Sequence, residues 1–267
     1  MNGLLPPTIT LALASLAVPA AAQQQPAESS GQVPDLTVRD FAAKYLMQQG
    51  DLANLKFYRD QDAAVIASAD PRPRVVLMGD SITYHWEAEL RPAPQGLNVI
   101  NRGIAGQNTD QMLLRFENDV VALHPRAVVI LAGTNDARVY VGAPADARAA
   151  VVARITRNIR AMADIADGQR VKVVIAAIPP CRNCAALQRD PATIVAVNDQ
   201  LRQFAAERGY PFVDYYAALA GPDGQLPAAM TRDGLHPLPA GYALMWQRLD
   251  SALASLALDR KGDRKGQ

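Results

Sequence analysis

Residues 74–82 read RVVLMGDSI, an unbroken apolar run that ends in a glycine followed by small polar residues. Consecutive apolar side chains, some of them β-branched, are typical of a strand that is buried on both faces, as in a parallel sheet. The glycine and the polar residues that follow predict that the strand ends there in a tight turn. The stretch therefore predicts the first strand of a parallel sheet, with polar side chains at its carboxyl end.

Similar apolar runs recur further along the chain, each bounded by polar residues, Gly or Pro. They are LNVI at 97–100, AVVILA at 127–132, VKVVIAAI at 171–178 and PFVDY at 211–215. Between and after them, apolar residues recur at helical spacing. These helical stripes are Met112, Phe116, Val120 and Leu123; Val152, Ile155, Ile159 and Met162; Ile194, Val197, Leu201 and Phe204; and Tyr242, Met245, Leu249, Leu253 and Leu256. This alternation predicts an α/β fold, a three-layer α/β/α sandwich with a flavodoxin-like five-stranded parallel sheet.

The composition is that of an ordinary soluble globular protein, with 267 residues of which 49% are hydrophobic and 20% charged. We expect one domain over residues 36–258, with residues 36–68 helical and packed onto it. The formal net charge is +1 and the basic residues are dispersed, which argues against a nucleic-acid partner. A small-molecule or glycan substrate fits this balance better, and the sequence indicates no oligomeric state.

The two ends of the chain differ in composition from the middle. An apolar stretch from Ile9 to Val18 is far shorter than the ~20 residues that cross a bilayer, and it ends in a run of small residues up to Ala22. We expect a signal peptide over 1–22, cleaved after Ala22, and export to the periplasm or beyond; a frayed apolar tail is the alternative. Residues 23–35 are expected to be a flexible lead-in and residues 259–267 a solvated tail, with no transmembrane segment in the mature chain.

The chain has two cysteines, Cys181 and Cys184, in the segment PPCRNCAAL. In an exported protein, such a pair favours a local disulfide over a redox centre or a metal site. A reduced pair is the alternative. No further ligands for a zinc site are evident, so we expect neither a metal nor another cofactor.

Polar residues follow three of the expected strands, as GDSI at 79–82, NRGI at 101–104 and GTND at 133–136. A fourth polar segment, DGLHP at 233–237, lies just before the last helix. In an open parallel sheet, ligands bind beyond the carboxyl ends of the strands. The four segments are therefore expected to meet in one site.

These segments contain the parts that ester cleavage by a hydroxyl nucleophile requires. Ser81 is the expected nucleophile, His236 its general base, and Asp233 the acid that fixes the tautomer of His236. Donors for the developing oxyanion are expected from the Ser81 N–H, the Gly103 N–H and the Asn135 side-chain amide. The segments thus predict a serine hydrolase site.

Other polar residues of these segments are given supporting roles. Asp80 and Asp136 are expected to hold the loops by hydrogen bonds. Arg102 either lines the entrance or is solvated.

The remaining histidines have no carboxylate placed as Asp233 is for His236. His124 ends a helix just before Pro125, where a histidine commonly interacts with the last carbonyls. His85, about one helical turn after Ser81, either shapes the acyl pocket with Trp86 or has a plain surface or packing role.

The segments GDSI, the Gly of NRGIAG, GTND and DGLHP, in that order, closely resemble the four signature blocks of the GDSL or SGNH hydrolases, over residues 36 to 256. Within that superfamily, the stretches 101–136 and 231–245 resemble bacterial proteins related to the acetylhydrolases of platelet-activating factor and lysophospholipase-type esterases. The resemblance implies the same fold and the same assignment of Ser81, Asp233, His236, Gly103 and Asn135. Ile82 stands where the family name has Leu, a swap of similar apolar volume.

The function we expect is hydrolysis of short-chain acyl esters, acetyl esters above all, with carbohydrates as one class of carrier. A lysophospholipase or thioesterase acting on longer acyl chains is the main alternative. A metal-dependent phosphoesterase and a non-catalytic carbohydrate-binding domain are remote alternatives. An α/β-hydrolase is disfavoured, because Thr83 stands where its G-x-S-x-G motif requires the last glycine.

Overall fold

The computed structural model describes residues 50–86, 96–138 and 144–258. Its centre is a five-stranded sheet in the order β2-β1-β3-β4-β5, in which every neighbouring pair is parallel. The strands are β1 (Arg74–Gly79), β2 (Asn98–Gly103), β3 (Ala127–Leu131), β4 (Lys172–Ala176) and β5 (Phe212–Val213). This strand order is flavodoxin-like, and sheets of this order commonly bind ligands at the carboxyl ends of β1 and β3. The predicted fold class is confirmed.

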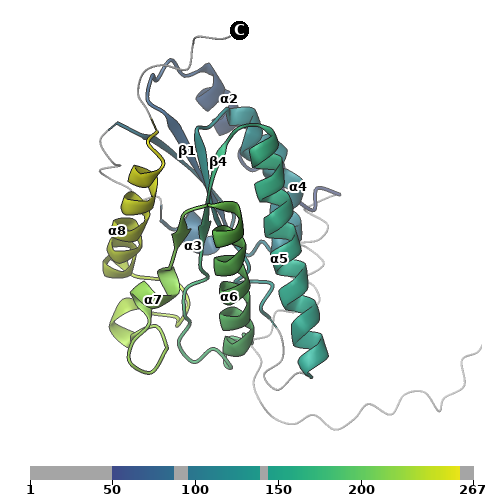
Figure 1. The fold of residues 1–267 in the computed structure, drawn as a ribbon, viewed down its shortest axis with the longest axis vertical. Coiled ribbons are helices and arrows are strands. Elements are labelled where there is room, and N and C mark those ends of the chain that lie inside the picture. The colour runs from purple at the N-terminus through teal and green to yellow at the C-terminus, as the bar shows by residue number, and fades with distance from the viewer. Residues whose placement is uncertain (1–49, 87–95, 139–143, 259–267) are drawn as a thin grey trace, which may run out of the picture. The chain divides into compact units, whose positions relative to one another are not determined.

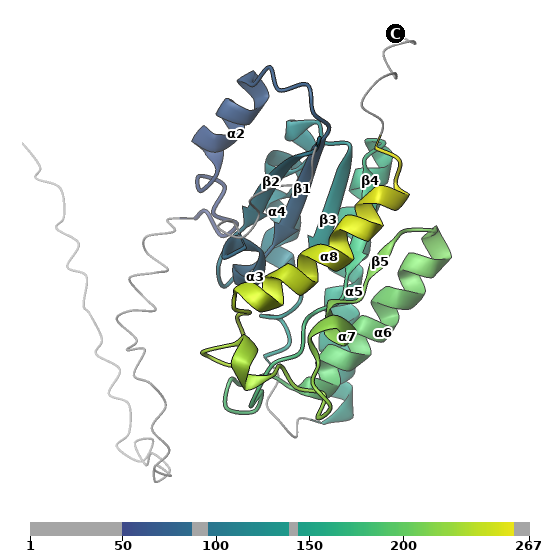
Figure 2. The same ribbon diagram turned by 90° about the vertical axis from the view of Figure 1, so that its left-hand side faces the viewer.

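Helices cover both faces of the sheet (Figures 1 and 2). Along β1, Val76 and Met78 belong to one apolar cluster, whereas Val75 and Leu77 belong to another. The first cluster includes residues of α4 (Thr109–Asp119), α5 (Ala145–Gly168) and α6 (Pro191–Arg208). The second includes residues of α3 (Ser81–Tyr84), α7 (Tyr215–Leu219) and α8 (Pro239–Ser255). The alternation of side chains along each strand therefore gives the sandwich its two cores.

One predicted helical stripe is interrupted. Helix α4 ends at Asp119, and the predicted stripe continues into a 3-10 helix, η3 (Val121–Leu123). Pro125 disfavours a helical conformation in the residue before it, and His124 adopts a left-handed φ of 49°. The apolar residues of the stripe stay buried, but the helix does not run through them.

The prediction of a helix throughout 36–68 is wrong for residues 50–58, which form turns; α2 (Arg59–Ala67) is helical. The Asp51 carboxylate accepts the N–H of Leu55 at 2.8 Å, a side-chain bond that competes with helix formation. The segment is nevertheless packed onto the sheet as expected, since the buried Tyr58 hydroxyl donates to the carbonyl of Gly103 at the end of β2.

The expected signal peptide (1–22), the lead-in (23–35), the first part of the predicted helical segment (36–49) and the tail (259–267) lie outside the described residues. Within the described part of the chain, no helix is long and apolar enough to span a membrane. The remaining short element is a 3-10 helix, η4 (Ala228–Met230), which precedes the loop with the predicted acid and base.

Candidate active site

Ser81 is the first residue of α3, and only Asp80 separates it from the end of β1. Asp80 caps this helix, because its Oδ1 accepts the N–H of Ile82 at 2.9 Å. The N–H of a first-turn residue has no acceptor within its own helix, so the Ser81 N–H can face a ligand. Close packing fixes the turn, since a Cβ at Gly103 would overlap the backbone nitrogen of Tyr84.

A chain of hydrogen bonds joins Ser81 to the loop before α8. The Ser81 Oγ lies 2.8 Å from His236 Nε2, and His236 Nδ1 lies 2.5 Å from Asp233 Oδ2. With a neutral imidazole, Nδ1–H donates to the carboxylate and Nε2 accepts the serine O–H. The structure thus brings the predicted nucleophile, base and acid together in the order that proton transfer requires.

The turn that carries the acid and the base is held from both sides. The Asp233 Oδ1 accepts the N–H groups of Leu235 and His236, each at 2.9 Å. Gly234 has a φ of 83°, and its carbonyl accepts the N–H of Arg182 at 2.7 Å. A Cβ at Gly234 would lie 2.6 Å from the Arg182 carbonyl oxygen, so only glycine fits here.

The same contacts keep Asp233 ionised. Partial burial raises the pKa of its carboxyl, but hydrogen bonds from the His236 ring and from the backbone N–H groups of His236 and Leu235 outweigh burial. They hold the pKa well below its usual range. Asp233 is therefore charged at neutral pH and can orient an imidazole that accepts a proton.

Gly103, one of the predicted oxyanion donors, is not free to act. Its N–H donates to the Asn101 side chain, at 2.8 Å from Oδ1. Gly103 is also the last residue of β2, opposite Gly79 of β1. Gly106 lies in the exposed loop beyond the strand, with a φ of 80°. Its N–H has no hydrogen-bond acceptor among the described residues. Gly106 is the glycine of this segment whose N–H is available to a ligand.

Asn135, the predicted side-chain donor, lies beside this loop. Its Nδ2 donates to the Gln107 carbonyl at 2.9 Å, next to the Gly106 peptide. Its Oδ1 accepts from Arg189 Nη2 at 3.0 Å. A side-chain amide carries two N–H groups, so one of them remains for a ligand.

Asp80 and Asp136 have the contacts of loop supports. Asp80 is fully buried, which raises the pKa of its carboxyl to about 6 against the opposing bond from Ile82. Asp136 accepts both the N–H and the hydroxyl of Thr109, the latter at 2.6 Å, and burial raises its pKa as well. Asp136 thereby fixes the start of α4 to the end of β3.

Arg102 occupies neither of the positions expected from the sequence. It is 2% exposed and forms an ion pair of 2.7 Å with Asp62 of α2. Its guanidinium lies 4.5 Å from the centre of the Tyr58 ring. Arg102 therefore binds the segment 50–67, which precedes β1, to the sheet and does not line an entrance.

The other histidines differ in their relation to His236. The ring of His85 is exposed and meets that of His236 edge-on, with centroids 5.2 Å apart. Trp86 does not join it at the surface, since it is buried against Tyr242. His124 is exposed at the end of η3.

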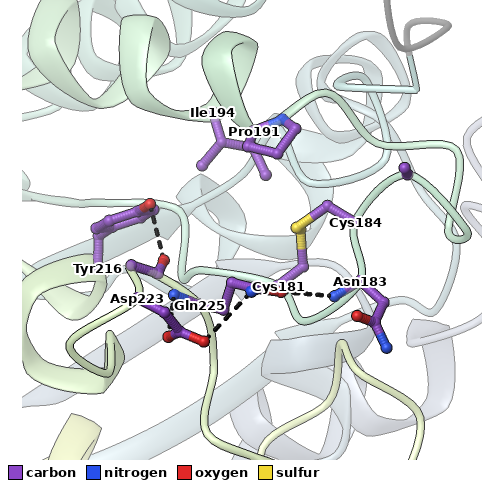
Figure 3. Close-up of a pocket in the computed structure, with 10 residues that line it drawn as sticks. Cys181, Asn183, Cys184, Pro191, Ile194, Tyr216, Asp223 and Gln225 are labelled. Atoms are coloured by element: carbon purple, nitrogen blue, oxygen red, sulfur yellow. Dashed lines mark hydrogen bonds between the residues drawn. A yellow bond between two sulfur atoms is a disulfide. The ribbon is translucent and has the colours of Figure 1, made fainter.

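Cys181 and Cys184 form a disulfide bond in the loop between β4 and α6. Figure 3 shows the disulfide beside a pocket of about 400 Å³. Its wall also contains Tyr216, Asp223 and Gln225. A separate pocket of about 420 Å³ lies over the predicted acid and base, and is lined by His85, Arg232, Asp233, His236, Pro237, Leu238, Pro239 and Tyr242. Within the described ranges, no three His, Cys, Asp or Glu side chains are grouped to hold a metal ion.

Comparison with known protein families shows where this arrangement of residues also occurs. The model of the GDSL-like lipase/acylhydrolase family matches residues 77–244, which include all four polar segments.

The chain belongs to the GDSL-like lipase/acylhydrolase family.

As a member of this family it is an ester hydrolase, and its relatives agree. The rat platelet-activating factor acetylhydrolase IB subunit alpha1 is 28% identical over 208 residues, covering 74% of this chain and 82% of that protein. A GDSL-like lipase from Bacteroides thetaiotaomicron is 33% identical, with a TM-score of 0.67 over 76% of this chain and 98% of that one. An acetylxylan esterase from Geobacillus stearothermophilus shares the fold, with 22% identity and a TM-score of 0.55 over 72% of this chain and 97% of that one.

Some residues at or near this site were not predicted from the sequence. Gly106 could have been found from the spacing of NRGIAG, whose second glycine falls beyond the strand. Arg189 and Tyr58 carry no such signal, because their contacts join segments far apart in the chain.

Proposed function

We propose that this GDSL-family hydrolase is a serine esterase that removes short acyl groups, acetyl above all, through an acyl-enzyme on Ser81. The observation that carries the proposal is the hydrogen-bonded chain from Ser81 through His236 to Asp233 at the carboxyl edge of the sheet. Neither a metal nor another cofactor has a part in this proposal.

In the proposed reaction, the Ser81 Oγ attacks the ester carbonyl carbon while its proton passes to His236 Nε2. The tetrahedral intermediate collapses, the bond to the alcohol oxygen breaks, and His236 gives its proton to the leaving alcohol. Water then attacks the acyl-Ser81 carbonyl carbon and gives a proton to His236. The bond from this carbon to Oγ breaks, His236 returns the proton to Oγ, and the acid and the free serine are released. Asp233 stays ionised throughout and stabilises the imidazolium.

Three donors would stabilise the oxyanion in both halves of the reaction: the Ser81 N–H, the Gly106 N–H and the free N–H of Asn135. They come from the ends of β1, β2 and β3, which lie next to each other in the sheet. Each such donor typically contributes ~3 kcal/mol of transition-state stabilisation.

Preference for a short acyl group is supported by the lining of the pocket at His236. Four of its eight lining residues are charged or polar, namely His85, Arg232, Asp233 and His236, and the other four are Pro237, Leu238, Pro239 and Tyr242. A long acyl chain is better served by an apolar wall. The rat relative is an acetylhydrolase by name, which supports the same choice. We propose acetylated glycans as the carriers, because they are the acetyl esters that an exported enzyme most readily meets.

Export is part of the proposal. It is supported by the apolar stretch before Ala22 and by the Cys181–Cys184 disulfide, since disulfides persist mainly in oxidising compartments. Mass spectrometry of the protein secreted by its natural host should find Gln23 as the first residue. A mature chain that retains Met1 would contradict cleavage.

The proposal is tested by initial rates on p-nitrophenyl acetate, butyrate, octanoate and palmitate. We expect the rate to be highest on acetate and to fall steeply beyond butyrate. Ser81→Ala should abolish turnover and leave the fold intact, whereas the exposed Ser251→Ala on α8 should change nothing. Turnover by Ser81→Ala would end the serine mechanism, and a preference for octanoate or palmitate would favour a lysophospholipase or thioesterase.

A further inference from the structure

Arg189 is a buried cation next to the proposed site that no step of the mechanism uses. It lies in the loop between β4 and α6 and is 4% exposed. Its guanidinium donates to three oxygens: the Thr134 carbonyl at 3.1 Å, the Leu187 carbonyl at 2.9 Å and the Asn135 Oδ1 at 3.0 Å. Within the described part of the chain, no carboxylate forms an ion pair with it.

A buried charge without an ion-pair partner is costly. Burial lowers the pKa of Arg189, as does the nearby Arg138, whereas the negative charges of Asp80 and Asp233 act in the opposite direction. An arginine nevertheless stays protonated in proteins. The chain therefore keeps a positive charge beside Asn135, although an apolar side chain would avoid the cost of burial.

The contacts of Arg189 decide how the Asn135 amide is oriented. An asparagine amide can turn over and exchange its oxygen and nitrogen, but a guanidinium has only donors and can face only the oxygen. On the other side, the Gln107 carbonyl can accept only from Nδ2. Both neighbours therefore select the same orientation of the Asn135 amide. One neighbour is a backbone carbonyl, so Arg189 is the one whose contact a substitution can remove.

We propose that Arg189 is a positioning residue for the oxyanion hole, which fixes the Asn135 amide so that its free N–H meets the oxygen of the ester carbonyl. The inference rests on the proposed function of Ser81 and Asn135. A fixed donor needs no reorganisation as charge develops, which is the main source of oxyanion stabilisation.

The test compares three variants on p-nitrophenyl acetate. Arg189→Met removes the donors, and we expect kcat to fall about 10- to 100-fold with KM almost unchanged, because the contact acts on the transition state. Arg189→Lys keeps the charge but not the planar fork, so it should recover only part of the rate. Arg148→Met is the matched control, since Arg148 anchors the adjacent Asp190 at 2.7 Å and does not contact Asn135; its kcat should not change.

A double-mutant comparison separates positioning from general support. Because Arg189 acts through Asn135, Arg189→Met in an Asn135→Ala background should cost little beyond Asn135→Ala alone. Losses in kcat that multiply would overturn the proposal, as would an unchanged kcat in Arg189→Met or Arg189→Lys. If Arg189→Met fails to fold, the same cycle is run with Arg189→Lys. Failure of the proposed function itself is distinguishable, because Ser81→Ala would then still turn over.

Discussion

Two carboxyl groups flank the proposed nucleophile, and their environments push their pKa values in opposite directions. Asp233 is held ionised by the His236 ring and by backbone N–H groups. Asp80 is fully buried, its Oδ2 has no hydrogen-bond partner among the described residues, and burial raises its pKa to about 6. One carboxylate can therefore orient the base, while the other caps α3 at a cost to stability.

Asp233→Asn tests the orienting role. An asparagine can hold the turn but accepts or donates according to its amide orientation, so it no longer selects the Nδ1–H tautomer of His236. We expect kcat on p-nitrophenyl acetate to fall by ~10⁴ with the fold unchanged. Asp250→Asn, an exposed carboxyl on α8, is the control and should leave kcat as it is. A loss of less than tenfold would mean that the imidazole is oriented without Asp233.

Asp80→Asn tests the buried carboxyl through its pH dependence. A folded-state pKa of about 6, above the ordinary 3.8, means that the folded chain holds the proton more tightly than the unfolded chain. This contribution is fully present below pH 3.8 and is lost as pH rises through 6, a change of up to about 3 kcal/mol. Asparagine does not titrate, so the stability of Asp80→Asn relative to wild type should rise between pH 4 and 7.

The measurement for Asp80 is urea unfolding of both proteins across that pH range. Only the change with pH is used, so a fixed difference between Asn and Asp cancels. A relative stability that stays constant or falls with rising pH would show that the ionised carboxyl is well accommodated.

At the scale of elements, the strands were predictable because their apolar runs are continuous, as in RVVLMG over β1. The end of β2 was not. Its apolar run stops at Ile100, yet pairing with β1 extends it to Gly103, opposite Gly79. Gly103 therefore lies inside β2, where the Asn101 side chain accepts its N–H, and the N–H available to a ligand is that of Gly106. Sheet register is a long-range property, and the local pattern does not contain it.

The residues of the candidate site also fall into those that the sequence could predict and those that it could not. Ser81, Asp233 and His236 could be found because each lies in a short polar segment at an expected strand end or before the last helix. Arg189 could not, because its role depends on the β4–α6 loop folding back onto Asn135, 54 residues earlier. The prediction of a helix over 36–68 is wrong for residues 50–58, because the Asp51 carboxylate accepts a backbone N–H in competition with helix formation.

The disulfide loop connects both halves of the site, which gives an element-scale prediction. Arg189 N–H donates to the Cys184 carbonyl at 2.9 Å, and Arg182 N–H donates to Gly234 beside the acid and base. The native protein should show no titratable thiol. Cys181→Ser together with Cys184→Ser removes a short closed loop worth up to about 2 kcal/mol, so Tm should fall by a few degrees.

Thermal unfolding of the double serine variant and thiol titration before and after reduction measure both effects. Two reactive thiols in the untreated protein would contradict the disulfide. An unchanged Tm would show that backbone contacts alone hold the loop.

At the scale of the whole molecule, the proposed site exists only when the sheet is assembled. Ser81, Gly106 and Asn135 follow three different strands, and His236 comes from a loop 155 residues after Ser81. With a net charge of +1, the chain offers no general attraction for anionic substrates. Specificity must therefore come from the pocket walls around these loops.

The arrangement of the whole site favours serine-dependent over metal-dependent hydrolysis. A metal-dependent phosphoesterase needs several histidines and carboxylates facing one point, whereas both ring nitrogens of His236 already have partners in Ser81 and Asp233. We therefore expect hydrolysis of p-nitrophenyl acetate to survive dialysis against EDTA. A fluorophosphonate should inactivate the enzyme with one adduct per chain, found on the Ser81 peptide by mass spectrometry and missing in Ser81→Ala. Loss of activity on chelation, restored by a divalent cation and accompanied by indifference to the fluorophosphonate, would assign the chemistry to a metal.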